Sequence, residues 1–315
     1  MMKLLNIIAF PATVVLGLLL MLSGLVPSIS PNVSSWLPLL GLAFPVLFLL
    51  VLLTFLYWLI QRKWRSLFSL SCLLLNLGPA SLYVQWNDLK AERSEAEHRE
   101  ESLDVEMNMG SQRLKIISYN AQLFGLYQDE TSVSIVNTEY MPAMDSFLRV
   151  MKAEKADVVC LQEVYAKSGG LKALARFLKA EGGFDYSQTY TLSDSRPYGM
   201  IVLSKYKIKR WQPISLGPNT GNMAMWVDIE LASRSDKHRN ARIRVYNLHL
   251  QSFRFAKQDY AVMQKQTQEQ EIDIEGSKGI ISRLRLGYKR RAEQVAIVKE
   301  NMIACDFPKI ICGDF

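Results

Sequence analysis

The chain has 315 residues and a formal net charge of +7, a length that allows one good-sized domain with additional segments. Residues 110–315 contain 30 of the 37 Lys and Arg but only 22 of the 30 Asp and Glu, so the basic excess belongs there. Such an excess suits a phosphorylated molecule or an acidic lipid surface, and it is equally typical of a merely basic soluble domain. The spacing of the four cysteines fits neither a zinc site nor a disulfide framework. We expect buried free thiols, with a disulfide between neighbouring strands as the alternative.

The N-terminal part of the chain is apolar. No charged residue occurs between Lys3 and Arg62. Two apolar stretches, about residues 4–26 and 37–60, are each long enough for a transmembrane helix, which takes about 20 residues. Their tandem arrangement argues against a signal peptide. A third uncharged stretch, residues 66–87, contains polar and helix-breaking residues; we interpret it as a further span, with a surface helix as the alternative.

These stretches predict that residues 1–87 are a membrane anchor of two or three transmembrane helices. The loop "QRKWR" between the second and third stretches is basic, and basic loops stay on the cytoplasmic side. Three spans would place the rest of the chain outside the cytoplasm, whereas two would leave it inside. We expect a multi-pass protein of the inner (cytoplasmic) membrane with an extracytoplasmic domain, joined by a charged linker over residues 88–110.

Residues 111–315 show an alternating pattern of strands and helices. Short apolar runs predict strands, and amphipathic runs with helix start and stop residues predict helices. The expected strands are 114–120, 157–163, 184–190, 198–204, 222–231, 241–250 and 308–315, and the expected helical regions are 141–156, 170–183 and 256–305. Mixed elements in this order indicate an α/β sandwich with sheets inside and helices outside.

Four of the expected strands end on a polar residue after a buried run. These residues are Asn120, Glu163, His249 and Asp314, and Asn247 lies two residues before His249 on the same face of its strand. Taken singly, each is typical of a turn, a solvated strand end or a structural histidine. Taken together, they form an oxygen-rich set with one imidazole at strand ends, where catalytic groups are both held and exposed. Oxygen ligands of this kind suit Mg²⁺ or Mn²⁺ rather than zinc.

Five phrases carry a resemblance to a known family. "ISYNAQLF", "ADVVCLQEV", "YGMIVLSK", "VYNLHLQS" and "IICGDF" occur in this order. In order and spacing they resemble the motifs of the endonuclease/exonuclease/phosphatase superfamily, over about residues 113–315. The resemblance implies a four-layer α/β sandwich domain. The N-terminal apolar segments lie outside it, as in membrane-anchored bacterial members.

The resemblance also implies roles for the polar strand ends. Glu163 is the main metal ligand, and Asn120 is a second ligand that also donates a hydrogen bond to a phosphate oxygen or to the neighbourhood of Glu163. His249 donates to the scissile phosphate or protonates the leaving oxygen. Asp314 orients the attacking water or helps to deprotonate it.

Three further residues are weaker candidates. Asn247 is a candidate substrate contact, although a plain asparagine on the strand surface fits as well. Tyr198 and Gly199 are expected to border the cleft.

The implied function is that of a membrane-anchored phosphodiesterase or nuclease that uses Mg²⁺ or Mn²⁺. Nucleic acids and phospholipid head groups are the two candidate substrate classes, and no obligate protein partner is expected. In the family an Asn follows the Gly-Asp-Phe motif and an Asp-His pair comes later. The sequence ends at Phe315, so we expect a domain truncated at its C-terminus. The alternative is a catalytically incomplete membrane protein that binds phosphorylated ligands without hydrolysis.

Overall fold

The structure is a computed structural model that describes residues 2–83, 114–125, 142–166, 170–192, 198–217, 221–231, 241–253, 255, 257–268 and 273–315. The chain divides into two units. One comprises residues 1–101 with 252–293, and the other comprises residues 102–251 with 294–315. The predicted linker, residues 88–110, lies outside the described residues.

The first unit is helical. Its apolar segment forms α1 (Met2–Leu25), α2 (Leu37–Leu42), α3 (Phe44–Ile60), α4 (Ser66–Leu75) and α5 (Leu77–Ser81). The unit also holds α9 (Lys257–Gln268) and the larger part of α10 (Ile274–Ile303). A small cluster that includes Leu20, Val51 and Leu73 is buried between α1, α3 and α4.

One helix among the described residues is long and apolar enough to cross a membrane, and it covers Leu5–Ser28. The predicted stretch 37–60 breaks at Ala43, where Pro45 lies in the first turn of α3, so its longer piece has only 17 residues. The stretch 66–87 breaks at Asn76, which leaves a helix of 10 residues and one of five. The prediction of two or three spans is therefore not supported. The multi-pass topology and the extracytoplasmic domain depended on that count, so they lose their support as well.

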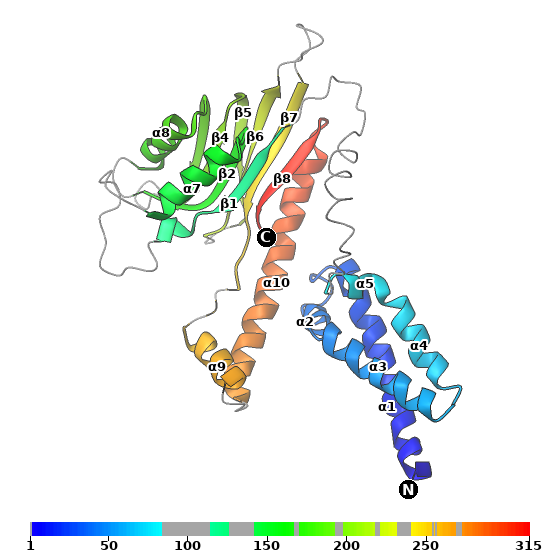
Figure 1. Cartoon of the computed structure of the whole chain (residues 1–315). Helices are drawn as coiled ribbons and strands as arrows, with labels where there is room; N and C mark the ends of the chain where they lie inside the picture. Colours follow the sequence, from blue (N-terminus) through cyan, green and yellow to red (C-terminus); the bar gives the residue numbers. More distant parts are fainter. Residues whose placement is uncertain are drawn as a thin grey trace. The chain divides into compact units, whose positions relative to one another are not determined.

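The second unit contains two four-stranded sheets (Figure 1). The first has the order β1-β2-β4-β3, and the second has the order β5-β6-β7-β8. Their strands are β1 (Ile116–Asn120), β2 (Val158–Tyr165), β3 (Tyr186–Thr191), β4 (Tyr198–Ser204), β5 (Lys207–Ile214), β6 (Met223–Leu231), β7 (Ala241–His249) and β8 (Lys309–Asp314). The pairs β1–β2 and β7–β8 are parallel and the others are antiparallel, so both sheets are mixed.

The two sheets face each other across an apolar core. Cys160 and Val202 of the first sheet pack with Met225, Val245 and Cys312 of the second. On the outer side of the first sheet, α7 (Pro142–Ala153) and α8 (Gly170–Gly182) cover a second cluster. The C-terminal part of α10 packs on the outer side of the second sheet. The predicted α/β class, with sheets inside and helices outside, is confirmed.

One detail differs from the sequence-based expectations. Strand β5, "KIKRWQPI", was not predicted, because its charged residues and Pro213 do not give the apolar run of a central strand. It is an edge strand that pairs with β6 alone, and edge strands tolerate proline and exposed lysines. The expected helical region 256–305 contains two helices, α9 and α10. All four cysteines are free and buried, as predicted.

An ion pair between β6 and β7 gives a test of how this sheet is stabilised. Arg244 donates from Nε to Asp228 Oδ1 at 2.7 Å and from Nη2 to Asp228 Oδ2 at 3.0 Å. The Asp228 side chain is only 1% exposed. We expect Asp228→Ala to lower the free energy of unfolding by about 3 kcal/mol, because the guanidinium loses its partner in a buried site.

Hydrogen exchange of the β6 and β7 amides at increasing denaturant concentration measures this free energy locally. Lys209→Ala is the matched control. It breaks the more exposed pair with Glu230 in the same sheet and should cost less than about 1 kcal/mol. Equal effects of the two substitutions would contradict the role given to the buried pair.

Candidate active site

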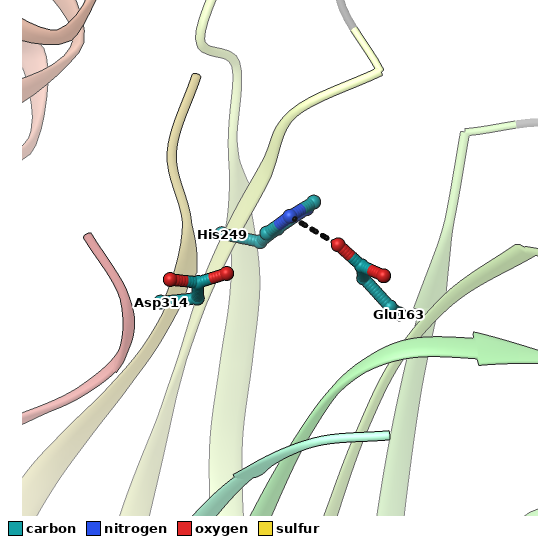
Figure 2. Close-up of side chains that lie close together, drawn as sticks. All are labelled: Glu163, His249 and Asp314. Atoms are coloured by element: carbon teal, nitrogen blue, oxygen red, sulfur yellow. Dashed lines mark ion pairs between the residues drawn. The ribbon is translucent and has the colours of Figure 1, made fainter. Parts of the chain in front are cut away.

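The four polar strand ends predicted from the sequence meet in the second unit. Asn120 is the last residue of β1 and Glu163 lies near the end of β2, whereas His249 and Asp314 end β7 and β8. In the parallel pairing of β7 with β8, His249 stands opposite Asp314. Figure 2 shows the side chains of Glu163, His249 and Asp314 gathered around one point, and one ligand atom from each lies within 4.8 Å of the others.

Hydrogen bonds link these residues across the two sheets. His249 Nε2 lies 3.1 Å from Glu163 Oε1 (Figure 2). Asn120 Nδ2 donates to Asp314 Oδ2 at 2.9 Å. The amide oxygen of Asn120 accepts a hydrogen bond from the backbone N–H of Gln122 at 3.0 Å, which fixes the orientation of the side chain. In both bonds, one partner (Asn120 or Glu163) comes from the first sheet and the other (Asp314 or His249) comes from the second.

The site favours an ionised Glu163. The hydrogen bond with His249 lowers the pKa of Glu163; partial burial opposes this effect, and a hydrogen bond with Asn120 lowers the pKa further. The side chain of His249 is only 8% exposed. Its Nδ1 atom is buried and has no hydrogen-bond partner among the described residues. Unsatisfied buried polar atoms are rare, and a catalytic role is one of the explanations for them.

The backbone at Glu163 is unusual. Its φ of 49° lies in the left-handed region, which non-glycine residues seldom adopt. The pairing of β2 with β4 shifts at the same place, between Leu161 and Val164, which marks a β-bulge. Bulges next to active sites re-aim a side chain, and the strain of such a residue must be compensated by its surroundings.

Glycine is required beside Asp314 for a steric reason. A Cβ atom on Gly313 would lie 2.1 Å from the backbone oxygen of Leu248, and its φ of 151° also disfavours other residues. Glycine therefore lets β8 run close beside β7 immediately before the carboxylate that faces His249.

The chemistry of these residues fits a divalent cation. Two carboxylates and one imidazole face one another, and the amide of Asn120 adjoins them. Two ligands on opposite sides of a Mg²⁺ ion are about 4.2 Å apart, since each bond is about 2.1 Å long. The observed spread of up to 4.8 Å is close to this value. The assignment of Asn120 as a metal ligand stays a prediction, because its amide nitrogen contacts Asp314.

Two of the three weaker candidates are buried, and the third is partly buried. Asn247 is fully buried between the sheets, so neither a substrate contact nor a position on the strand surface describes it. Gly199 is also buried, and a Cβ atom there would lie 2.0 Å from the backbone oxygen of Tyr190. Close packing of β4 against β3 accounts for this glycine. Tyr198, which precedes it, is partly buried against the core between the sheets.

The sequence interpretation missed Gln162. This side chain is 1% exposed and contacts Asn247 in the opposite sheet. The available signal was a polar residue within the otherwise apolar run "VVCLQE". Such a residue must find a buried hydrogen-bond partner if its strand is covered on both faces.

Two family models match the chain. The model of the endonuclease/exonuclease/phosphatase family matches residues 117–315, more than half of the chain. A domain of unknown function, DUF8431, matches residues 4–83. A search of curated proteins gave no match.

Several solved structures also resemble the chain. An endonuclease/exonuclease/phosphatase family protein from Leptotrichia buccalis is 15% identical, with 64% of this chain and 66% of that chain covered and a TM-score of 0.35. TDP2 from Caenorhabditis elegans is 18% identical, with 67% and 60% covered and a TM-score of 0.28. ANGEL2, a 2′,3′-cyclic phosphatase, is 18% identical, with 63% and 51% covered and a TM-score of 0.37. The chain spans between 51% and 66% of the length of these three proteins.

The close approach at Gly313 leads to a prediction. We expect Gly313→Ala to push β8 away from β7, because the added methyl group would overlap the Leu248 carbonyl. The hydrogen bond from Asn120 to Asp314 should then be lost. The side-chain amide resonances of Asn120 in an NMR spectrum of the full chain, assigned with an Asn120 variant, measure this change.

Gly183→Ala is the matched control. Gly183 has a similarly disfavoured φ of 70°, but a Cβ atom there meets nothing within 4 Å. It should leave the Asn120 resonances unchanged. An unchanged Asn120 signal in Gly313→Ala would show that the glycine does not place Asp314.

Proposed function

Because the chain belongs to the endonuclease/exonuclease/phosphatase family, we propose that it is a divalent-metal-dependent phosphodiesterase or nuclease. It would hydrolyse phosphate ester bonds by in-line attack of water. The observation that carries this proposal is the convergence of Asn120, Glu163, His249 and Asp314 from two different sheets. Two carboxylates that face one imidazole at strand ends are the kind of group that binds a cation and a phosphate.

Glu163 and Asp314 are the residues that would hold the cation, with Asn120 beside them. Bound there, Mg²⁺ or Mn²⁺ would neutralise negative charge that develops on the phosphate oxygens. The lowered pKa of Glu163 keeps this carboxylate ionised, as a ligand must be.

His249, Asp314 and Asn120 would perform the proton transfers and orient the reacting groups. The Nε2 atom of His249 faces the carboxylates and can donate a hydrogen bond to a phosphate oxygen or a proton to the leaving oxygen. The exposed carboxylate of Asp314 can orient a water molecule and accept its proton. Asn120 holds Asp314 through its amide N–H, which limits the directions in which that carboxylate can point.

We further propose that α1 tethers the chain to a membrane. The helical segment Leu5–Ser28 has the length and hydropathy of a span. Large apolar side chains also remain exposed on α1, α3 and α4 of the first unit: Leu5, Ile7, Val15, Leu18, Val46, Leu49, Leu53, Leu67 and Leu74. Exposed apolar surface of this extent is typical of a membrane contact. A tethered enzyme would meet two pools of phosphodiesters, nucleic acids and phospholipid head groups.

The activity is tested on the full chain with bis(p-nitrophenyl) phosphate, DNA, RNA and phospholipid vesicles, each with Mn²⁺, with Mg²⁺ and with chelator. We expect metal-dependent hydrolysis that His249→Ala reduces by about 100-fold or more, as expected for the loss of a general acid. Glu163→Gln should reduce it by a similar factor. Glu300→Gln, on the exposed side of α10, is the control and should have no effect.

Hydrolysis that persists in chelator, or in Glu163→Gln at the wild-type rate, would contradict the metal-dependent mechanism. Tight binding of a phosphorylated ligand without turnover would favour the alternative, a domain that binds phosphorylated ligands only.

The tether is tested by fractionation of cells that express the full chain. We expect the chain in the membrane fraction after carbonate extraction, because α1 would be embedded in lipid. A variant without residues 2–28 should move largely to the soluble fraction or become extractable. Complete extraction of the full chain by carbonate would contradict a spanning helix.

A further inference from the structure

A β-bulge turns two neighbouring side chains of β2 toward the second sheet. The register of β2 against β4 shifts between Leu161 and Val164, so Gln162 and Glu163 stand opposite a single residue of β4. In a regular strand, neighbouring side chains point to opposite faces. Here both contact β7 of the other sheet. Without the bulge, Glu163 and Gln162 could not both reach that strand.

Two buried amides hold this bulge. Gln162 Nε2 donates to Asn247 Oδ1 at 2.7 Å and lies 3.2 Å from Ser118 Oγ. Asn247 Nδ2 donates to the backbone oxygens of Leu161 at 3.1 Å and Ile201 at 3.4 Å. These two backbone oxygens belong to the last paired residues of β2 and β4 before the bulge. The side chain of Asn247, from the second sheet, therefore binds both β2 and β4 of the first sheet at the point where the pairing of these two strands is interrupted.

The amide pair lies directly below the site. Asn247 precedes His249 by two residues on the same face of β7, and Gln162 is adjacent to Glu163. Their contact therefore fixes the distance between β2 and β7 immediately beside the 3.1 Å contact of His249 with Glu163. The backbone oxygen of Gln162 also accepts from Ala121 N at 2.9 Å, next to Asn120 on β1.

We infer that Gln162 and Asn247 are a positioning pair: their hydrogen bond sets the bulge and the sheet spacing that aim Glu163 at His249. This inference rests on the function proposed above. Stability alone does not explain two amides that are 1% and 0% exposed. Replacing both partners of a buried hydrogen bond with apolar groups of the same shape is often nearly neutral for folding. Apolar residues cannot, however, form the directional hydrogen bonds that Asn247 donates to the backbone oxygens of Leu161 and Ile201 beside the bulge.

The test separates folding from positioning with three variants of the full chain. Asn247→Ala breaks the pair. The double variant Gln162→Met with Asn247→Leu replaces it with apolar side chains of similar size. The exchanged pair, Gln162→Asn with Asn247→Gln, keeps both amides. Ser204→Ala is the control. This buried hydroxyl lies at the end of β4 away from the bulge and donates to the backbone oxygen of Tyr206, which follows β4.

The first measurement is the ¹⁵N chemical shift of His249 Nε2, assigned with a His249 variant. It reports the hydrogen bond to Glu163 and requires neither metal nor turnover. We expect this shift to move toward that of a free imidazole in Asn247→Ala and in the apolar double variant. It should stay at the wild-type position in Ser204→Ala and return toward it in the exchanged pair.

The second measurement is Mn²⁺ affinity by electron paramagnetic resonance, followed by kcat and KM for bis(p-nitrophenyl) phosphate. We expect the apolar double variant to lose about 10- to 100-fold in Mn²⁺ affinity and kcat, the range seen when residues that orient metal ligands are replaced. Its KM should change little and its thermal midpoint should stay near that of the wild type.

An apolar double variant with the wild-type histidine shift and Mn²⁺ affinity would overturn the inference, because the pair would then be a replaceable part of the core. A failure of the proposed function is a different result. The wild type would then turn over no substrate, while the histidine shift would still report whether the pair places Glu163 against His249.

Discussion

The candidate site depends on a fixed spacing between two sheets. Asn120 and Glu163 come from the first sheet, and His249 and Asp314 come from the second, so no single sheet contains the site. The apolar core between the sheets supplies most of the burial that holds them together. Apolar packing is not directional, however, and it fixes the spacing of side chains less sharply than hydrogen bonds do. The cross-sheet bonds at the strand ends therefore set the geometry in which two carboxylates and an imidazole face one another.

The same site contains three unfavourable local features. Glu163 has a positive φ, His249 keeps a buried nitrogen without a partner among the described residues, and Gly313 permits a backbone approach that a methyl group would prevent. Each of these features costs stability taken alone. They occur together around one small set of side chains, and the rest of the sandwich compensates for them. Local strain and unsatisfied polarity beside two carboxylates are expected of a site shaped for binding rather than for stability.

The sequence predicted that the site residues converge, because four short apolar runs, each typical of a strand, end on a polar residue. It did not predict the bulge at Glu163, since positive φ in a non-glycine residue has no sequence signal. It identified the face of β7 that carries Asn247 but could not tell that a second sheet covers this face. It also missed β5, whose charged edge residues mask the strand pattern, and it overestimated the membrane spans, because hydropathy does not show the helix break near Pro45.

The central claim is that the two sheets together form one divalent-cation site. Anomalous diffraction from a crystal of the full chain grown with Mn²⁺ tests it most directly. We expect a single strong peak between the carboxylates of Glu163 and Asp314, beside Asn120 and His249, and the loss of that peak in Glu163→Gln. A crystal with no peak there at saturating Mn²⁺, or with the ion bound elsewhere, would show that the two sheets do not form this cation site.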